Sequence, residues 1–402
     1  MVLSVFGPLK QVPGYAWTIT ALITGILLGG FFPAALEFIS IGTQWFIKLI
    51  IQIVPIFIFL ALSPPIATLV QRGSAGKFGG SVILLFVLSS TVAGLVGVVL
   101  SSLLFNIPLV SESHGKALDL VSTLCGIGEH GASLPLISIL LAIALGAVSV
   151  FIPPLLKLLG HVSKAISNMG RGIGYVMAPL IFCFGVTIGV RFGAQLGISH
   201  YFNTVVYTFV LCLMWFLLAV FILVKLLARQ SVGKALKEYF IPTAMFAAGT
   251  CSSLVTLPVN LSRAKAYGVR NEVADFVIPF GAVINLNASA LVYLALGPFV
   301  MSHVFDFDVS WTLLLIAWPI LVLFTIAAPG LPAGMGTPLW AATLFASLAG
   351  VEDPTKATFV ATYIALCGGI TDMLITAVNC TTDGFVAIFF DCHFDRYFAK
   401  KG

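Results

Sequence analysis

The chain has 402 residues, of which 59% are hydrophobic and only 9% charged, and its mean hydropathy is +1.10. Soluble domains contain about 25% charged residues, so this composition excludes an ordinary soluble protein and predicts a polytopic membrane protein. The formal charge of +5 is too small and scattered to indicate nucleic-acid binding. The seven cysteines form no CxxC pair, so neither a disulfide framework nor a zinc site is expected.

Six continuous apolar segments occupy the first half of the chain. Each is typical of a membrane helix, because a span needs about 20 apolar residues and a longer helix can tilt. The first is longer than the apolar region of a signal peptide, and we interpret it as the first span. The six segments are 14–35, 41–70, 78–106, 133–158, 174–196 and 201–228.

Four segments in the second half each contain a polar or glycine-rich interruption. Backbone that leaves helical geometry within a membrane must find partners in protein or in a water-filled cavity, so we expect the interruptions to meet around one polar chamber. Kinked helices packed through small residues are the alternative for any single interruption. The segments are 236–266, 273–301, 309–349 and 356–391, with interruptions GTCSSLVTLPV (249–259), NLNAS (285–289), APGLPAGMG (328–336) and NCTTDG (379–384).

The order of these interruptions repeats. A bend that contains Leu-Pro, at 257–258 and again at 331–332, precedes a segment with a central asparagine, Asn285 and then Asn379. Interrupted segments at matching places in two halves indicate a transporter built from inverted repeats.

The basic residues predict the orientation. If the amino terminus is cytoplasmic and segments 236–266 and 309–349 are re-entrant hairpins, all but four of the 20 Lys and Arg residues face the cytoplasm. This bias obeys the positive-inside rule and places both termini in the cytoplasm. The four exceptions are Lys48, Lys116, Arg191 and Lys356.

The last interrupted segment carries a polar stripe. At 100° per residue, Asp372, Thr376, Asn379 and Asp383 fall within about 60° of one another on a helix. An acid at the centre of a membrane helix costs about 2.5–3.5 kcal/mol, so both acids need partners, and a structural ion pair is the alternative to a binding site. Eleven residues of helix separate the acids by about 16 Å, too far for the shared proton of an aspartyl protease. An ammonium group at Asp372 and a small cation near Asp383 fit better.

Four stretches, CSSLVTLPV, PFGAVINLNAS, GLPAGMG and DMLITAVNCTTD, resemble in this order the motifs of the dicarboxylate/amino acid:cation symporter (DAACS) family, which includes the glutamate transporters. The resemblance implies an all-α membrane protein with eight transmembrane helices, two re-entrant hairpins and inverted repeats. It also implies a homotrimer that works as an elevator. Within one polytopic unit, 1–402, the parts at about 1–70 and 133–228 would be mainly scaffold, and 76–106 and 234–391 would be mainly transport domain.

The resemblance also implies a substrate site. Asp372 would hold an amino group, Asn379 and the hairpin tip at Ser252 and Ser253 would hold the main carboxylate, and Leu331 would lie in the gating hairpin. Thr376 and Ser289 would lie close by.

Two departures from the family pattern concern the substrate. Ile375 stands where members that carry acidic substrates have the arginine for the side-chain carboxylate, and Cys251 replaces the hairpin-tip arginine of other members. A second substrate carboxylate would be buried unpaired, so we expect a neutral amino acid. The alternative is an acidic amino acid or a dicarboxylate held by another donor.

The cation sites implied by the resemblance are unevenly kept. One sodium site maps onto Gly281, Asn285, Asn379 and Asp383, all present. A second site retains the oxygens of Ser89 and Ser90 but has Asn287 for an aspartate and Phe86 for a tyrosine, and a third loses threonines at Val283 and Ala328.

Fewer coupled Na⁺ ions are therefore expected than in the glutamate transporters, with one as the simplest case. Proton coupling or no coupling is the rival expectation. The sequence thus predicts a secondary symporter of neutral amino acids in the cytoplasmic (inner) membrane, with the lipid bilayer as its surroundings. A channel would need an open polar pore, which the clustering of interruptions in one half of the chain disfavours.

Overall fold

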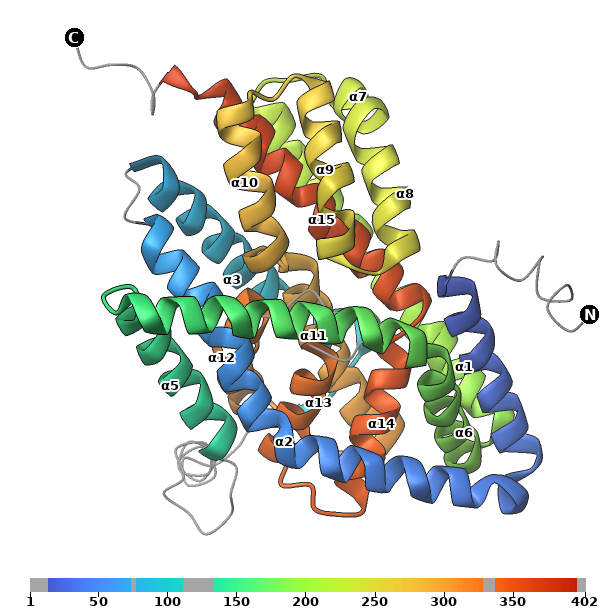
Figure 1. The fold of residues 1–402 in the computed structure, drawn as a ribbon. Helices are drawn as coiled ribbons and strands as arrows, with labels where there is room; N and C mark the ends of the chain where they lie inside the picture. The colour runs from blue at the N-terminus through green and yellow to red at the C-terminus, as the bar shows by residue number, and fades with distance from the viewer. Residues whose placement is uncertain (1–13, 74–76, 111–132, 328–336, 396–402) are drawn as a thin grey trace, which may run out of the picture.

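Helices build nearly all of the secondary structure in the computed structural model, which describes residues 14–73, 77–110, 133–327 and 337–395 (Figure 1). Among these residues, four helices are long and apolar enough to cross a membrane: Lys77–Leu104, Gly197–Leu227, Asn271–Val304 and Ile370–Cys392. Five further apolar helices are shorter. The chain is a largely helical membrane protein, as its composition predicts.

The first half forms long helices whose bounds differ in places from the predicted segments. Segment 133–158 divides at 150–152, since the proline pair at 153–154 begins a new helix. Segment 174–196 and most of segment 201–228 lie in one helix, which leaves helical geometry at Gly193, where φ is 76° and ψ is 165°. Residues 220–227 of segment 201–228 belong to η2. The elements are α1 (Gly14–Phe31), α2 (Pro33–Gly73), α3 (Lys77–Phe105), α5 (Ser133–Ser149), α6 (Pro153–Ala219) and η2 (Val220–Leu227).

Glycines allow α1 and α6 to pack at backbone distance. A Cβ on Gly25 would overlap the carbonyl oxygen of Phe182, and a Cβ on Gly189 would overlap that of Ile26. Close packing through small residues is the usual way in which membrane helices associate, because lipid leaves no hydrophobic driving force between them. This pair joins the first helix of the chain to a helix more than 100 residues later.

The segment 236–266 forms the predicted helical hairpin. It contains η3 (Ala235–Phe240), which follows α7 (Val232–Lys234), then α8 (Ile241–Thr250) and α9 (Ser253–Tyr267), and α8 and α9 pack side by side (Figure 1). The turn lies at Cys251, which has a left-handed φ of 47°, and Ser252, which caps α9. The break lies within the predicted interruption at 249–259, of which residues 253–259 belong to α9.

The segment 309–349 forms two helices that also pack against each other, α12 (Trp311–Ala327) and α13 (Thr337–Leu348). Its predicted interruption at 328–336, which includes Leu331, lies outside the described residues.

Both predicted broken helices are broken, but one of them is broken elsewhere. α10 (Asn271–Ile284) ends at Asn285 and α11 (Asn287–Phe299) begins after Leu286, within the predicted interruption. α11 continues as η4 (Val300–Val304).

The break in the last segment was wrongly predicted at 379–384. α14 (Thr355–Cys367) and α15 (Ile370–Cys392) are separated at Gly368 and Gly369, where Gly369 has a φ of 63° that favours glycine. Residues 379–384 stay helical, because their polar side chains find partners without unwinding the backbone: Thr381 Oγ1 donates to the Ala377 carbonyl and Thr382 Oγ1 to that of Asn379.

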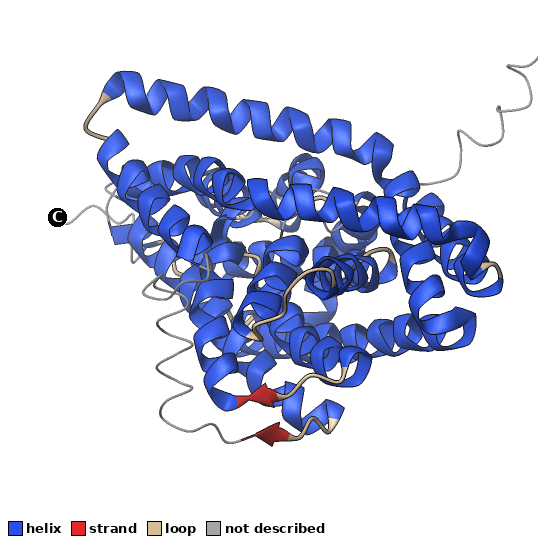
Figure 2. Ribbon diagram, turned by 90° about the horizontal axis from the view of Figure 1, so that it is seen from below, coloured by secondary structure: helices blue, strands red, loops and turns tan. Residues whose placement is uncertain are grey.

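One pair of short strands departs from the all-α prediction. β1 (Leu109–Val110), after α3, pairs in parallel with β2 (Val309–Ser310), before α12 (Figure 2). Each strand has only two residues. The pair ties the end of α3 to the start of the second hairpin.

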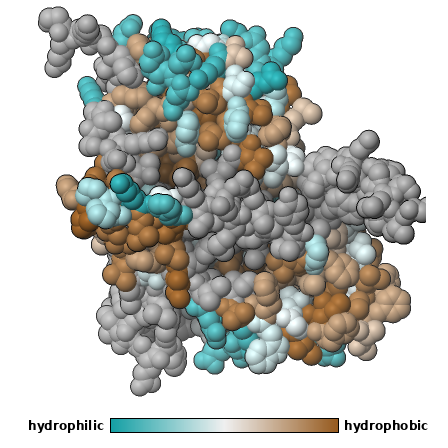
Figure 3. Space-filling view, in the orientation of Figure 1, coloured by the Kyte–Doolittle hydropathy of each residue, from teal (hydrophilic) through white to brown (hydrophobic). Residues whose placement is uncertain are grey.

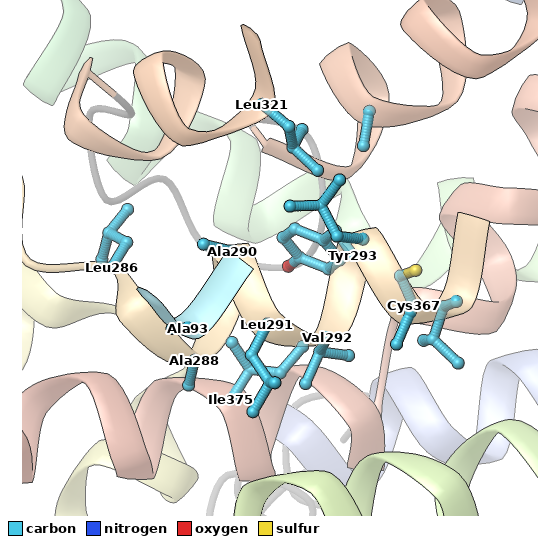
Figure 4. Packing of buried hydrophobic residues seen from close by; sticks show 14 of the residues in the cluster. Ala93, Leu286, Ala288, Ala290, Leu291, Val292, Tyr293, Leu321, Cys367 and Ile375 are labelled. Atoms are coloured by element: carbon cyan, nitrogen blue, oxygen red, sulfur yellow. The ribbon is translucent and has the colours of Figure 1, made fainter. Parts of the chain in front are cut away.

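α11 lies at the centre of the second half. In the apolar span Asn271–Val304, 89% of the window is buried, against 33% in Gly197–Leu227. Figure 4 shows the apolar side chains of α11 among residues of α3, α12 and α15. On the face seen in Figure 3, hydrophilic side chains gather at the upper end and near the lower edge, with apolar ones between. α11 is therefore buried in protein, whereas the more exposed apolar helices can face lipid.

The Gly384 position tests this packing. A Cβ at Gly384 would overlap the ring and hydroxyl of Tyr239, which is fully buried. We expect Gly384→Ala to lower the free energy of unfolding by about 1–3 kcal/mol, the usual cost of overpacking. Thermal melts of the purified protein in detergent measure this loss of stability. Gly233→Ala is the matched control, since nothing lies within 4 Å of its Cβ, and equal melts for the two variants would contradict the packing described.

Candidate functional site

The polar stripe predicted on the last helix lies on one continuous helix, α15. Asp372, Thr376, Asn379 and Asp383 are exposed by only 7%, 6%, 4% and 1%. The two acids are about 16 Å apart along the axis. Two separate polar clusters therefore form along α15, one around each acid.

Asp372 lies in the first turn of α15, directly after the break at Gly369. The positive end of the helix dipole stabilises a carboxylate there, and Thr376 Oγ1 lies 3.4 Å from Asp372 Oδ1 as a donor. The backbone N–H of Ile370 donates to the Tyr201 hydroxyl of α6 at 3.2 Å. The break thus creates a helix N-terminus where the sequence places an acid.

Asn379 joins the middle of α15 to the first turn of α11. Its Oδ1 accepts from the backbone N–H of Ala288 at 2.9 Å, and its Nδ2 donates to Ser289 Oγ at 2.9 Å. Both partners lie in the stretch that follows the break at Asn285. The two predicted binding residues, Asn379 and Ser289, are therefore in direct contact.

Asp383 lies against the end of α10. Its Oδ1 accepts from Asn285 Nδ2 at 2.8 Å, and it occupies the space that a Cβ on Gly281 would fill. Asn285 faces this carboxylate with its amide nitrogen, while its own Oδ1 faces Asn287 and the Oδ1 of Asn379 accepts from Ala288. Gly281, Asn285 and Asp383 of the predicted cation site are thus in contact, and the Asp383 carboxylate is a hard-oxygen ligand of the kind that binds small cations.

The second predicted cation cluster does not fit. Asn287 presents its amide nitrogen, a donor, to Ser89 Oγ at 3.0 Å and to Asn285 Oδ1 at 3.0 Å. Ser90 is fully buried, and its hydroxyl has no hydrogen-bond partner among the described residues. A nitrogen donor occupies the centre where a cation would need oxygen.

The serine-rich tip of the first hairpin lies beside the middle of α15. Ser252 caps α9 by accepting from the Val255 N–H at 3.4 Å, and Cys380 Sγ lies 3.5 Å from Ser253 Oγ. Helix N-termini of this kind bind carboxylates, because their N–H groups lack helical acceptors. The predicted anion-binding tip thus contacts α15 at Cys380, the residue after Asn379.

Ile375 is 1% exposed and belongs to an apolar cluster with Ala288 and Leu291 of α11 (Figure 4). Its side chain can neither donate a hydrogen bond nor carry charge. The position that the resemblance assigns to an arginine is filled by apolar packing.

Three residues that hold the site together escaped the sequence analysis. Tyr239 OH donates to Asn260 Oδ1 at 2.6 Å, and Asn260 Nδ2 donates to the Cys380 carbonyl at 2.8 Å, so this pair fastens the hairpin to α15. Thr382 Oγ1 accepts from Asn287 Nδ2 at 3.2 Å. A sequence feature that could have indicated the Tyr239 contact is the glycine at 384, because the absence of a side chain there makes room for the Tyr239 ring.

The sequence model of the sodium:dicarboxylate symporter family matches residues 15–119 and 132–392. Among curated relatives, the C4-dicarboxylate transport protein of Pseudomonas chlororaphis is 27% identical over 83% of this chain and 79% of its own length. That of Xylella fastidiosa (strain M12) is 26% identical over 82% and 78%. That of Acidovorax sp. (strain JS42) is 28% identical over 73% and 69%.

The two hydrogen bonds by which Asn379 joins α15 to α11 should stabilise the fold even without a ligand. We expect Asn379→Ala to lower the free energy of unfolding by about 1–3 kcal/mol, because it leaves the buried Ala288 N–H and Ser289 hydroxyl without this partner. Detergent melts would measure the loss. Asn271→Ala is the control, because Asn271 is exposed in the first turn of α10, and this variant should have the melting temperature of the wild type. An Asn379→Ala variant with that same melting temperature would contradict the contribution of these two hydrogen bonds to stability.

Proposed function

Because this chain belongs to the sodium:dicarboxylate symporter family, we propose that it carries a neutral amino acid across the cytoplasmic membrane in symport with a cation. Membership makes it a multi-pass secondary symporter and not an enzyme. The substrate and the ion go beyond membership and are proposed from the residues of the site, whereas the oligomer is proposed from the resemblance in sequence.

The observation that carries the proposal is the distribution of basic residues. The sequence has no Lys or Arg between Lys237 and Arg263, and between Arg270 and Arg396 it has only Lys356. Lys356 Nζ donates to Ser347 Oγ at 3.2 Å, near the loop that follows α13. α8, α10, α11, α15 and the part of α9 before Arg263 therefore offer no guanidinium to a second substrate carboxylate, which would be buried at a high cost.

Asp372 also favours a substrate with an amino group. A buried carboxylate repels a dianion but attracts an ammonium group, and hydrogen bonds to a charged group contribute about 1.5–3 kcal/mol. A neutral amino acid has one carboxylate for the α9 N-terminus at Ser252 and Ser253, and one ammonium for Asp372. Its charges match the site one for one.

A second candidate substrate is a C4-dicarboxylate. The relatives found by similarity are C4-dicarboxylate transport proteins, and on this ground alone a dicarboxylate or acidic substrate is better supported than an amino acid. Identities of 26–28% are averages over the aligned residues, whereas the choice of substrate depends on a few side chains in the site. We give the charges of the site more weight, and the Asp372 experiment below separates the two.

For the mechanism we propose that α15 couples substrate to ion. Asp372 and Asp383 lie on one helix, with Asn379 between them holding the first turn of α11. A cation near Asp383 and Gly281 offsets the buried charge. It thereby stabilises the Asn285 position and the break from which α11 begins. Substrate contacts at Ser289 and Asn379 then depend on the ion through hydrogen-bonded neighbours. Na⁺ is the proposed ion, with H⁺ as the alternative.

The architecture we propose has eight transmembrane helices and two re-entrant hairpins in a homotrimer with cytoplasmic termini. The scaffold would comprise about 1–70 and 133–228, and the moving transport domain 76–106 and 234–391. The repeated order of hairpin and broken helix supports inverted repeats. The tight α1–α6 pair and the packing of α3 on α11 and α12 support this division.

Charge removal at Asp372 distinguishes the two substrate classes, because it should weaken binding of an amino acid but not of a dicarboxylate. We expect Asp372→Asn to weaken binding of alanine, serine or leucine about 10–100-fold, since an ammonium loses its counter-charge. If the substrate is a dicarboxylate, binding of succinate or malate should instead tighten or stay the same. Titration calorimetry of purified protein with each compound measures both.

Asp275→Asn is the matched control, since that carboxylate is 53% exposed and pairs with Lys265 at the surface. It should leave every affinity unchanged. Wild-type protein that binds only succinate or malate would overturn the amino acid proposal.

Gly281 tests the proposed cation. A methyl group at this position would displace the Asp383 carboxylate, so Gly281→Ala should raise the Na⁺ concentration for half-maximal thermal stabilisation by about tenfold or more, the equivalent of about 1.4 kcal/mol. Choline replaces Na⁺ to hold the ionic strength constant. Gly80→Ala, with nothing within 4 Å of its Cβ, should match the wild type, and an unaltered Gly281→Ala midpoint would refute a cation at this place.

A further inference from the structure

Four polar side chains from three parts of the fold meet beside the proposed cation site. We call Ser89, Asn285, Asn287 and Thr382 the amide cluster. The Asn287 Nδ2 atom lies 3.0 Å from Ser89 Oγ, 3.0 Å from Asn285 Oδ1 and 3.2 Å from Thr382 Oγ1. Three oxygens thus surround one nitrogen, as the oxygens of a binding site surround a cation.

The orientation of the Asn287 amide follows from Asp383. A carboxylate only accepts hydrogen bonds, so Asn285 must direct its Nδ2 toward Asp383 Oδ1, at 2.8 Å. Asn285 Oδ1 then faces the other way, toward Asn287, and requires a donor there. The charge on Asp383 therefore sets which atom of Asn287 lies at the centre of the amide cluster.

We propose that the Asn287 amide nitrogen takes the place of a bound cation, so that the amide cluster is closed to Na⁺. The amide nitrogen has two N–H groups, and it directs their positive ends toward oxygens that would otherwise be ligands. Asn287 and Asn285 are exposed by 2% and 1%, so water cannot easily replace these contacts. An entering ion would displace a tethered donor and leave it buried without acceptors.

The charge of the connected network agrees with this assignment. Among Ser89, Asn285, Asn287, Thr382 and Asp383, which these hydrogen bonds link, Asp383 alone carries a formal charge. One carboxylate offsets one monovalent cation, and a second would be buried without compensation. With the amide in place, the network holds a single ion, next to Gly281.

The inference concerns the number of coupled ions and is independent of the substrate class. Replacing an ion by a built-in donor removes one ion gradient from the driving force for uptake. The protein would also need no second ion to order the α10–α11 break, because Asn287 supplies the contacts itself.

Asn287→Asp tests the inference by restoring an acceptor and a charge. Binding to the folded state raises stability with ligand concentration in proportion to the ions bound. The slope of melting temperature against the logarithm of NaCl concentration, with choline chloride balancing ionic strength and no substrate present, should therefore be about twofold steeper in Asn287→Asp than in the wild type. Equal slopes would overturn the proposal.

Thr382→Val provides the matched second variant, and it keeps the test decisive if Asn287→Asp fails to fold. In the wild-type background it removes an oxygen from the amide cluster, and we expect the Na⁺ slope to stay unchanged because no ion is held there. A lower slope in Thr382→Val would reveal a cation in the cluster and refute the inference. In the Asn287→Asp background, the same substitution should reduce the gained slope.

Discussion

The structure depends on the requirement that polar side chains buried in an apolar interior find partners within the protein. α15 shows this requirement most clearly, because it carries three acids, an asparagine and four threonines, and all of these except Asp391 are buried. The partners come from the α10–α11 break, where Asn285 meets Asp383 and the first turn of α11 meets Asn379. The α10–α11 break supplies donors to Asp383 and to the Asn379 oxygen, and the Asn379 amide nitrogen donates in return to Ser289.

The same requirement decides where charge can lie. Asp372 follows a helix break, so its carboxylate lies at the positive end of the α15 dipole. The Asp383 carboxylate accepts a hydrogen bond from the Asn285 amide. α10, α11 and α15 contain no Lys or Arg. The ion pairs among the described residues join side chains outside this stripe, such as Lys265 with Asp275 and Arg270 with Asp391. The site therefore offers two separated negative charges and a helix N-terminus, which matches a zwitterion and one cation.

Family membership and side-chain chemistry answer different questions about this protein. The match to the sodium:dicarboxylate symporter family covers most of the chain and establishes a cation-coupled secondary symporter. The two substitutions that bear on specificity, isoleucine at 375 and asparagine at 287, change single positions within that frame. Ile375 joins the apolar core, and Asn287 joins a closed hydrogen-bond network. Both side chains are buried within the packed helices.

The sequence by itself determined the elements whose signals are local. Composition, apolar length and turn residues predicted the helices, the hairpin turn near Cys251 and the break at Asn285, because glycine, serine caps and apolar runs act within a few residues. Only the tertiary structure decided how polar residues are satisfied. The stretch 379–384 was wrongly predicted as a break, because its threonines bond within the helix and its asparagine bonds across to α11. The contacts of Tyr239 and Asn260 with α15 were missed for the same reason. A side chain's capacity to form hydrogen bonds is local, but its partner lies on another helix, and the direction of an amide such as Asn287 follows from a carboxylate nearly 100 residues away.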